Sequence, residues 1–125
     1  MKSILVVDDS HTVRQLILAC FAGDHFTVEE AEDGVEGLAL AKSGHFDLIF
    51  TDIYMPNMLG TDLIQKLRSL EKYKQTPIYI ITVDSDQKIK DKVKELGATG
   101  WILKPINYMQ LTAVIKEIFG DCAEL

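Results

Sequence analysis

Five short apolar runs alternate with segments of helical periodicity along this chain of 125 residues. The runs are Ile4–Val7, a weaker and partly polar segment at 25–32, Phe46–Thr51, Pro77–Thr82 and Trp101–Leu103. Continuous apolar runs are typical of strands covered on both faces. Strict alternation of strand and helix predicts a parallel sheet with helices on both faces. We therefore predict an α/β fold with a doubly wound, five-stranded parallel sheet.

The segments between the runs carry apolar residues at helical spacing. The residues expected to face inward are Val13, Leu16, Ile17, Cys20 and Phe21; Val35, Leu38 and Ala39; Leu59, Leu63, Ile64 and Leu67; Ile89, Val93 and Leu96; and Leu111, Val114, Ile115, Ile118 and Phe119. Ser10 is a candidate N-cap of the first helix. Gly44 and Gly97 are expected to end the helices that precede them.

Polar side chains stand where four of the predicted strands end: Asp8 and Asp9, Asp52, Thr82 and Lys104. In doubly wound sheets, sites form outside the carboxyl ends of the strands, where the winding reverses. If the strands follow the order 2-1-3-4-5, the first and third strands are neighbours. The three carboxylates would then share one pocket.

Three carboxylates at close range repel one another and need a proton or a cation. Their oxygens suit Mg²⁺, which often completes its shell with substrate phosphate. A carboxylate beside such a metal can act as a nucleophile and form an aspartyl-phosphate. Lys104 would supply charge, and Thr82 a hydroxyl, to the transferring group. No glycine-rich phosphate loop is present, which argues against nucleotide binding.

Composition excludes several classes of protein. The net charge of −6 and pI near 4.9 argue against a nucleic-acid binder. The apolar runs are too short for membrane insertion. We read Cys20 and Cys122 as free thiols, which favours the cytoplasm. His11, His25 and His45 lack ligand spacing and are expected at the surface.

From "ILVVDDS" through "FDLIFTDIYMPNMLG" and "PIYIIT" to "LKP", the chain resembles the receiver domain of two-component response regulators, most closely stand-alone CheY-like receivers. The resemblance implies a flavodoxin-like (βα)5 fold and one receiver domain over residues 1–125, with no output domain. It implies a signalling domain, not an enzyme, that assists only its own phosphorylation and dephosphorylation. The phosphoryl group would come from a sensor histidine kinase or a histidine phosphotransfer protein.

The resemblance assigns roles to the acidic residues. Asp52 corresponds to the phosphoacceptor. Mg²⁺ would be held by Asp8, Asp9, Asp52 and the backbone carbonyl of Tyr54, with Asp8 acting through water. Tyr54 and Asp84 fill positions that tune dephosphorylation.

Other roles follow from the same resemblance. Lys104 and Thr82 would assist catalysis, and Thr82 and Trp101 would form the switch together with Pro105, whose preceding peptide bond is cis in the family. Two positions depart from the usual pattern: Val83 where a small residue is common, and Trp101 where Tyr or Phe is usual. We expect altered switching at Trp101 with phosphorylation at Asp52 intact.

The resemblance also implies that a downstream protein binds the face of the fourth helix, fifth strand and fifth helix. The chain would be a monomer or a weak, activation-dependent dimer. A phosphorelay intermediate and a receiver fragment of a larger regulator stay open. A metal-dependent aspartyl-phosphate phosphatase is disfavoured, because the D-x-D-x-T pattern is missing after Asp52. A flavodoxin-type electron carrier is disfavoured because two acids stand where a phosphate would bind.

Overall fold

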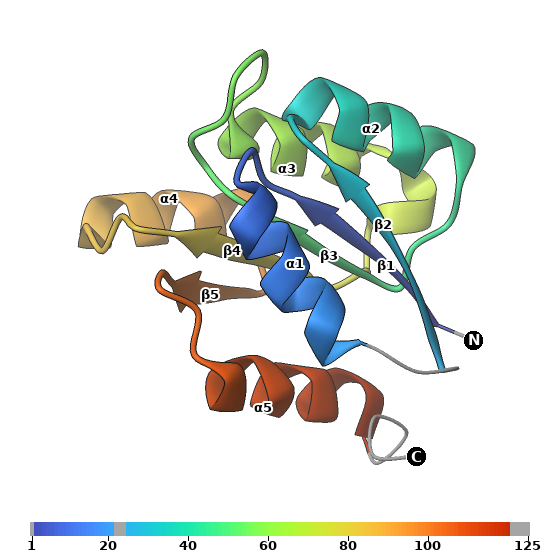
Figure 1. The fold of residues 1–125 in the computed structure, drawn as a ribbon. Helices are drawn as coiled ribbons and strands as arrows, with labels where there is room; N and C mark the ends of the chain where they lie inside the picture. Colours follow the sequence, from blue (N-terminus) through green and yellow to red (C-terminus); the bar gives the residue numbers. More distant parts are fainter. Residues whose placement is uncertain (1, 22–24, 121–125) are drawn as a thin grey trace.

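The structure is a computed structural model, which describes residues 2–21 and 25–120. Five parallel strands form one sheet in the order β2-β1-β3-β4-β5 (Figure 1). The strands are β1 Lys2–Val7, β2 Phe26–Ala31, β3 Leu48–Thr51, β4 Ile78–Thr82 and β5 Gly100–Leu103. The predicted flavodoxin-like sheet and its strand order are confirmed.

Helices cover both faces of this sheet. They are α1 His11–Cys20, α2 Gly34–Ser43, α3 Gly60–Ser69, α4 Gln87–Leu96 and α5 Tyr108–Phe119, with a short 3-10 helix, η1, at Glu71–Tyr73. Helices α1 and α5 lie on one face, and α2, α3 and α4 on the other (Figure 1). Successive strand residues point to opposite faces. Leu5 therefore packs under α2 and α3, while Ile4 packs under α1 and α5.

Several helix ends follow the sequence signals. The Ser10 hydroxyl caps α1 by accepting a hydrogen bond of 3.3 Å from the N–H of Val13. Gly97 ends α4 with a φ of 114°, a left-handed conformation that favours glycine. Gly44 follows α2 in an extended conformation instead.

The inward face predicted for α2 is wrong at two positions. Val35 is 52% exposed and Ala39 is also exposed, whereas Gly34 and Gly37 are buried. A Cβ at Gly37 would lie 2.8 Å from Cγ2 of Val7, so the helix axis runs very close to the sheet. Close approach through glycines leaves no apolar side chain to mark the packing face.

Helix α1 also differs from its predicted pattern. Leu16 is 48% exposed, while Arg14 is buried beside Ile17. Cys20 is half-buried on the apolar face and is a free thiol, as expected; Cys122 lies outside the described residues. None of the helices described here is long and apolar enough to cross a membrane.

Candidate functional site

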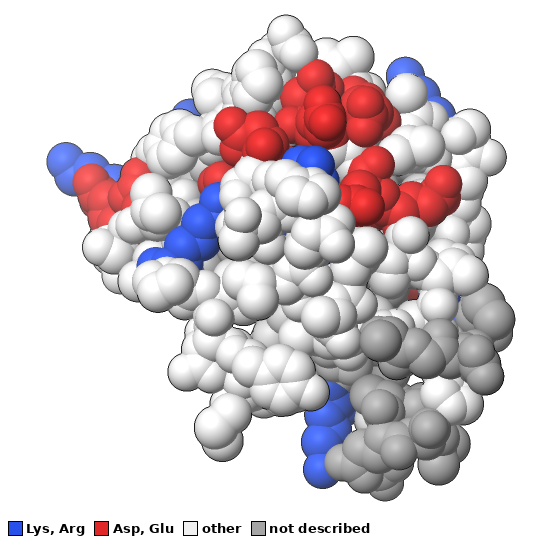
Figure 2. All heavy atoms as spheres, viewed as in Figure 1, with Lys and Arg blue, Asp and Glu red and all other residues white. Residues whose placement is uncertain are grey.

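An acidic cluster lies at the edge of the sheet where β1 and β3 end as neighbours. Val7 pairs with Thr51, which brings the residues that follow them side by side. One carboxylate oxygen from each of Asp8, Asp9 and Asp52 lies within 4.8 Å of the other two. Asp8 and Asp52 are buried, and Asp9 is exposed. Figure 2 shows acidic side chains gathered over this edge, with basic atoms among them.

Backbone hydrogen bonds hold the two buried acids in place. The N–H of Asp52 donates to the carbonyl of Val7 at 3.0 Å, so Asp52 continues the β1–β3 ladder. Oδ1 of Asp52 accepts from the N–H of Ile53 at 2.6 Å, and Oδ1 of Asp8 accepts from the N–H of Ser10 at 2.8 Å. These backbone bonds use only Oδ1, so Oδ2 of each carboxylate is available for contacts within the pocket.

The loop between β3 and α3 is fixed at two points. Nδ2 of Asn57 donates to Oδ2 of Asp33 at 2.7 Å, which ties the loop to the start of α2. The N–H of Gly60 donates to the carbonyl of Ile53 at 2.7 Å. A Cβ at Gly60 would overlap the carbonyl oxygen of Asp52, so only glycine fits where α3 begins.

Lys104 supplies positive charge to the cluster. Its Nζ donates a hydrogen bond of 2.7 Å to Oδ2 of Asp52 and lies 3.0 Å from Oδ2 of Asp8. The contact with Asp8 is an ion pair, and among the described residues Lys104 is the only one that offers a donor group to the buried Oδ2 of Asp8. The backbone N–H of Lys104 donates to the carbonyl of Thr82 at 2.8 Å.

The electrostatics of the pocket are set by burial and by this ion pair. Burial raises the pKa of Asp8, and the Ser10 N–H and Lys104 only partly offset that rise. Burial also lowers the pKa of Lys104, but its contacts with Asp52 and Asp8 outweigh burial, and the net shift is upward. Asp8 therefore carries its negative charge at a cost, which a bound cation would relieve.

Thr82 and the mouth of the pocket form a second group of contacts. The buried Oγ1 of Thr82 accepts a hydrogen bond of 3.3 Å from the N–H of Asp84, and no hydrogen bond joins it to the carboxylates within the described ranges. The hydroxyl of Tyr54 donates to Oδ2 of Asp84 at 2.6 Å. That bond raises the pKa of Tyr54 and lowers that of Asp84. Val83 is 71% exposed.

Trp101 lies apart from the carboxylates, on β5 against α4. Its half-buried ring lines a cavity of about 200 Å³ together with residues of α4 and the start of β5. Nζ of Lys90 lies 5.7 Å from the ring centroid, while the buried Nε1 of Trp101 has no hydrogen-bond partner among residues 2–21 and 25–120. The peptide bond between Lys104 and Pro105 is cis, as the resemblance implied.

One buried residue beside the cluster was missed by sequence reasoning. Nη1 of Arg14 donates to the backbone carbonyl of Asp8 at 2.6 Å, and its Nε donates to Glu30 on β2 at 2.9 Å. An arginine in an amphipathic helix normally keeps its charge in solvent. No signal in the sequence marked Arg14 as buried.

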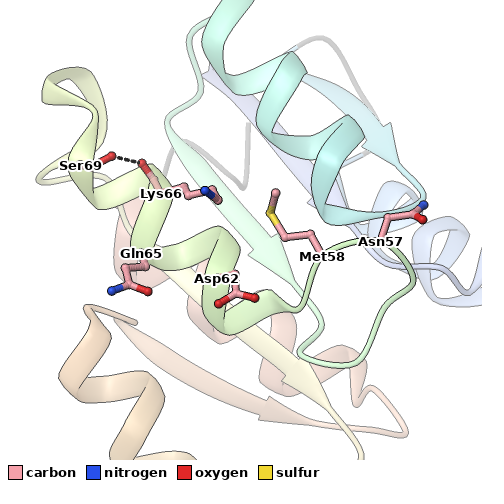
Figure 3. Close-up of a pocket in the computed structure, with 6 residues that line it drawn as sticks. All are labelled: Asn57, Met58, Asp62, Gln65, Lys66 and Ser69. Carbon is pink, nitrogen blue, oxygen red and sulfur yellow. Dashed lines mark hydrogen bonds between the residues drawn. The ribbon is translucent and has the colours of Figure 1, made fainter.

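A hollow along α3 and the three histidines lie outside the acidic cluster. A hollow of about 540 Å³ runs along α3, lined by Asn57, Met58, Asp62, Gln65, Lys66 and Ser69 (Figure 3). Its side chains carry both signs of charge and include none of the clustered carboxylates. His11, His25 and His45 are exposed, as expected.

A family model, related sequences and a solved structure all relate this chain to response regulators. Residues 4–116 match the response regulator receiver domain family. The chain is 34% identical to the chemotaxis protein CheY of Pseudomonas aeruginosa, over 93% of this chain and 94% of that protein. It is 31% identical to the transcriptional regulatory protein ResD of Bacillus subtilis, over 97% of this chain and 49% of that protein. The solved structure of chemotaxis response regulator CheY4 of Vibrio cholerae is similar, with a TM-score of 0.88 and 36% identity, covering 95% of this chain and 99% of that one.

Proposed function

This chain belongs to the response regulator receiver domain family, the CheY-like signalling domains of two-component systems, and we propose that Asp52 accepts a phosphoryl group from a histidine kinase or phosphotransfer protein. The single observation that carries the proposal is the convergence of Lys104 on two buried carboxylates, 2.7 Å from Asp52 and 3.0 Å from Asp8. A structural ion pair does not require the second buried acid, whose charge is unfavourable there.

The reaction uses the groups that face the pocket. A carboxylate oxygen of Asp52 attacks the phosphorus, the bond between phosphorus and the donor's imidazole nitrogen breaks, and the nitrogen keeps the electron pair. The product is an acyl phosphate on Asp52. The ammonium of Lys104 turns from the carboxylate to the phosphoryl oxygens and offsets their charge. Thr82 moves its hydroxyl toward the same oxygens and gives up its contact with Asp84.

The residues present fit Mg²⁺. Among the described residues, the buried Oδ2 of Asp8 has only the Lys104 ammonium as a partner, and three carboxylates supply hard oxygen ligands within a small volume. Asp8, Asp9, Asp52 and the backbone carbonyl of Tyr54 would hold the ion, with Asp8 acting through water. When bound, Mg²⁺ supplies positive charge to the incoming phosphoryl oxygens.

The signal then leaves through the face formed by α4, β5 and α5. We propose that Thr82 and Trp101 couple the new charge at Asp52 to this face and shift a pre-existing equilibrium. The cavity between Trp101 and α4 supports this route, because a ring beside a cavity has room to change its rotamer. In this proposal residues 1–125 act as one cytoplasmic receiver domain whose output is the binding of a protein partner.

Incubation with acetyl phosphate, with and without Mg²⁺, tests the proposal by intact mass. A single phosphoryl adduct that requires Mg²⁺ supports it. Absence of an adduct at saturating donor and Mg²⁺, in protein that is folded by circular dichroism, contradicts it.

A further inference from the structure

Arg14 is one of two arginines on the chain. Its buried side chain joins the acidic turn, Asp8–Asp9, to the neighbouring strand β2. Its side chain is 8% exposed. Nε pairs with Glu30 of β2 at 2.9 Å, and Nη1 donates to the carbonyl oxygen of Asp8, just past the end of β1, at 2.6 Å. The guanidinium therefore ties α1 to both strands, and its rigid fork reaches two acceptors at once.

The carbonyl that Arg14 binds belongs to the peptide group between Asp8 and Asp9. Rotation of that peptide would move the two acids relative to each other. The Asp8 side chain is also held by the N–H of Ser10 at 2.8 Å. In residues 2–21 and 25–120, the Asp9 carboxylate has no hydrogen bond or ion pair, so only its backbone fixes its position.

We propose that Arg14 is a positioning residue that holds the Asp8–Asp9 peptide so that both carboxylates face the Mg²⁺ site. The inference rests on the proposed Mg²⁺-assisted function. Glu30 offsets the charge of Arg14, which reduces the electrostatic penalty of placing a cation beside a metal site. Arg14 thus contributes to metal binding through the backbone, without touching the metal.

The direction in which Mg²⁺ affinity changes when Arg14 is replaced distinguishes a positioning role from a purely electrostatic one. Loss of a positive charge near three carboxylates would, by Coulomb's law alone, strengthen Mg²⁺ binding. Loss of positioning weakens it, and groups that orient metal ligands are typically worth about 10- to 100-fold in affinity. A purely structural role would lower stability and leave the affinity of the folded protein unchanged.

Arg68 provides the matched control. It is a half-buried arginine in the last turn of α3 that donates to the backbone carbonyls of Thr76 and Gly97, at 2.7 Å each. These carbonyls lie just before β4 and β5, at the opposite edge of the sheet from the acidic cluster. Both Arg68→Met and Arg14→Met should lower the unfolding temperature. Arg68→Met should not change Mg²⁺ affinity, because neither carbonyl belongs to the acidic turn.

The experiment is calorimetric titration of the full chain with Mg²⁺ alone. We expect Arg14→Met to bind at least about tenfold more weakly than wild type, with Arg68→Met unchanged. Arg14→Met/Glu30→Gln, which leaves no unpaired Glu30, should weaken binding equally. If Arg14→Met alone does not fold, the Mg²⁺ affinity of this double variant tests the positioning role. Arg14→Lys should be intermediate, because one ammonium cannot reproduce the fork.

Two results would overturn the inference. If a folded Arg14 variant binds Mg²⁺ as tightly as wild type or more tightly, the positioning role is rejected and the proposed function is unaffected. A wild-type chain that binds no Mg²⁺ would reject the proposed function and this inference together.

Discussion

Nζ of Lys104 donates a hydrogen bond of 2.7 Å to Oδ2 of Asp52, across the ends of β5 and β3. If this ammonium serves the phosphoryl oxygens, Lys104→Met should slow phosphorylation by at least about a hundredfold, the usual cost of losing a charge-stabilising group. Intact mass against time, with acetyl phosphate and Mg²⁺, measures the rate. Lys92→Met, on the exposed side of α4, is the control and should match wild type. An unchanged rate in Lys104→Met would remove the residue from the mechanism.

Asp8→Asn should stabilise the chain without Mg²⁺. Burial raises the folded-state pKa of Asp8 above its ordinary value of 3.8, so the ionised group lowers stability at neutral pH. As pH falls through the raised pKa, the folded state takes up a proton and this cost disappears. We expect the gain to be largest at neutral pH and to vanish as pH approaches 3.8.

Urea unfolding at several pH values measures this gain. Asp9→Asn is the matched control, because Asp9 is exposed and its substitution should change stability by less than about 0.5 kcal/mol. Destabilisation by Asp8→Asn at neutral pH would show that its ion pair with Lys104 outweighs its burial.

The contact between Tyr54 and Asp84 spans the mouth of the pocket. Tyr54→Phe removes the 2.6 Å hydrogen bond and keeps the ring, so we expect faster loss of the phosphoryl group as water reaches Asp52 more easily. The stability of the folded protein should stay close to that of wild type, because the hydrogen bond is exposed to solvent. The decay of the adduct after removal of the phosphodonor is the measurement. Asp84→Asn keeps an acceptor for the tyrosine hydroxyl and should change the decay less. Equal lifetimes of the phosphoryl adduct in Tyr54→Phe and wild type would show that the Tyr54–Asp84 hydrogen bond does not limit the access of water.

Trp101 is the only tryptophan and reports on the α4–β5 face. Its emission should change when Mg²⁺ and beryllium fluoride, a phosphoryl mimic, are added together, because the ring shares a cavity with α4 and lies under Lys90. The same titration of Asp52→Asn should leave the emission constant. A constant spectrum in wild type, with the mimic shown to bind, would count against Trp101 as a switch residue.

The sequence predicted the fold well because its signals are local. Apolar runs such as Ile4–Val7 and caps such as Ser10 and Gly97 depend on neighbouring residues, and strand alternation leaves few topologies. The packing faces were harder to predict. The close approach of Gly37 to Val7 is a tertiary contact, so the apolar pattern gave the wrong face for Val35.

The acids and the lysine at the strand ends could be predicted because a parallel sheet gathers its carboxyl ends at one edge. What could not be predicted is how each side chain is held. The buried position of Arg14 depends on an acid in a distant strand, Glu30. The bond from Tyr54 to Asp84 likewise joins residues that only the folded chain brings together.

The most direct test of the account is to identify the phosphorylated residue. Borohydride reduces an aspartyl-phosphate to homoserine, and peptide mapping after reaction with acetyl phosphate and Mg²⁺ locates it. The account predicts homoserine at position 52 alone, and none in Asp52→Asn. Homoserine at Asp8 or Asp9 in the wild type, or an unreduced Asp52 in protein that carries the phosphoryl adduct, would contradict it.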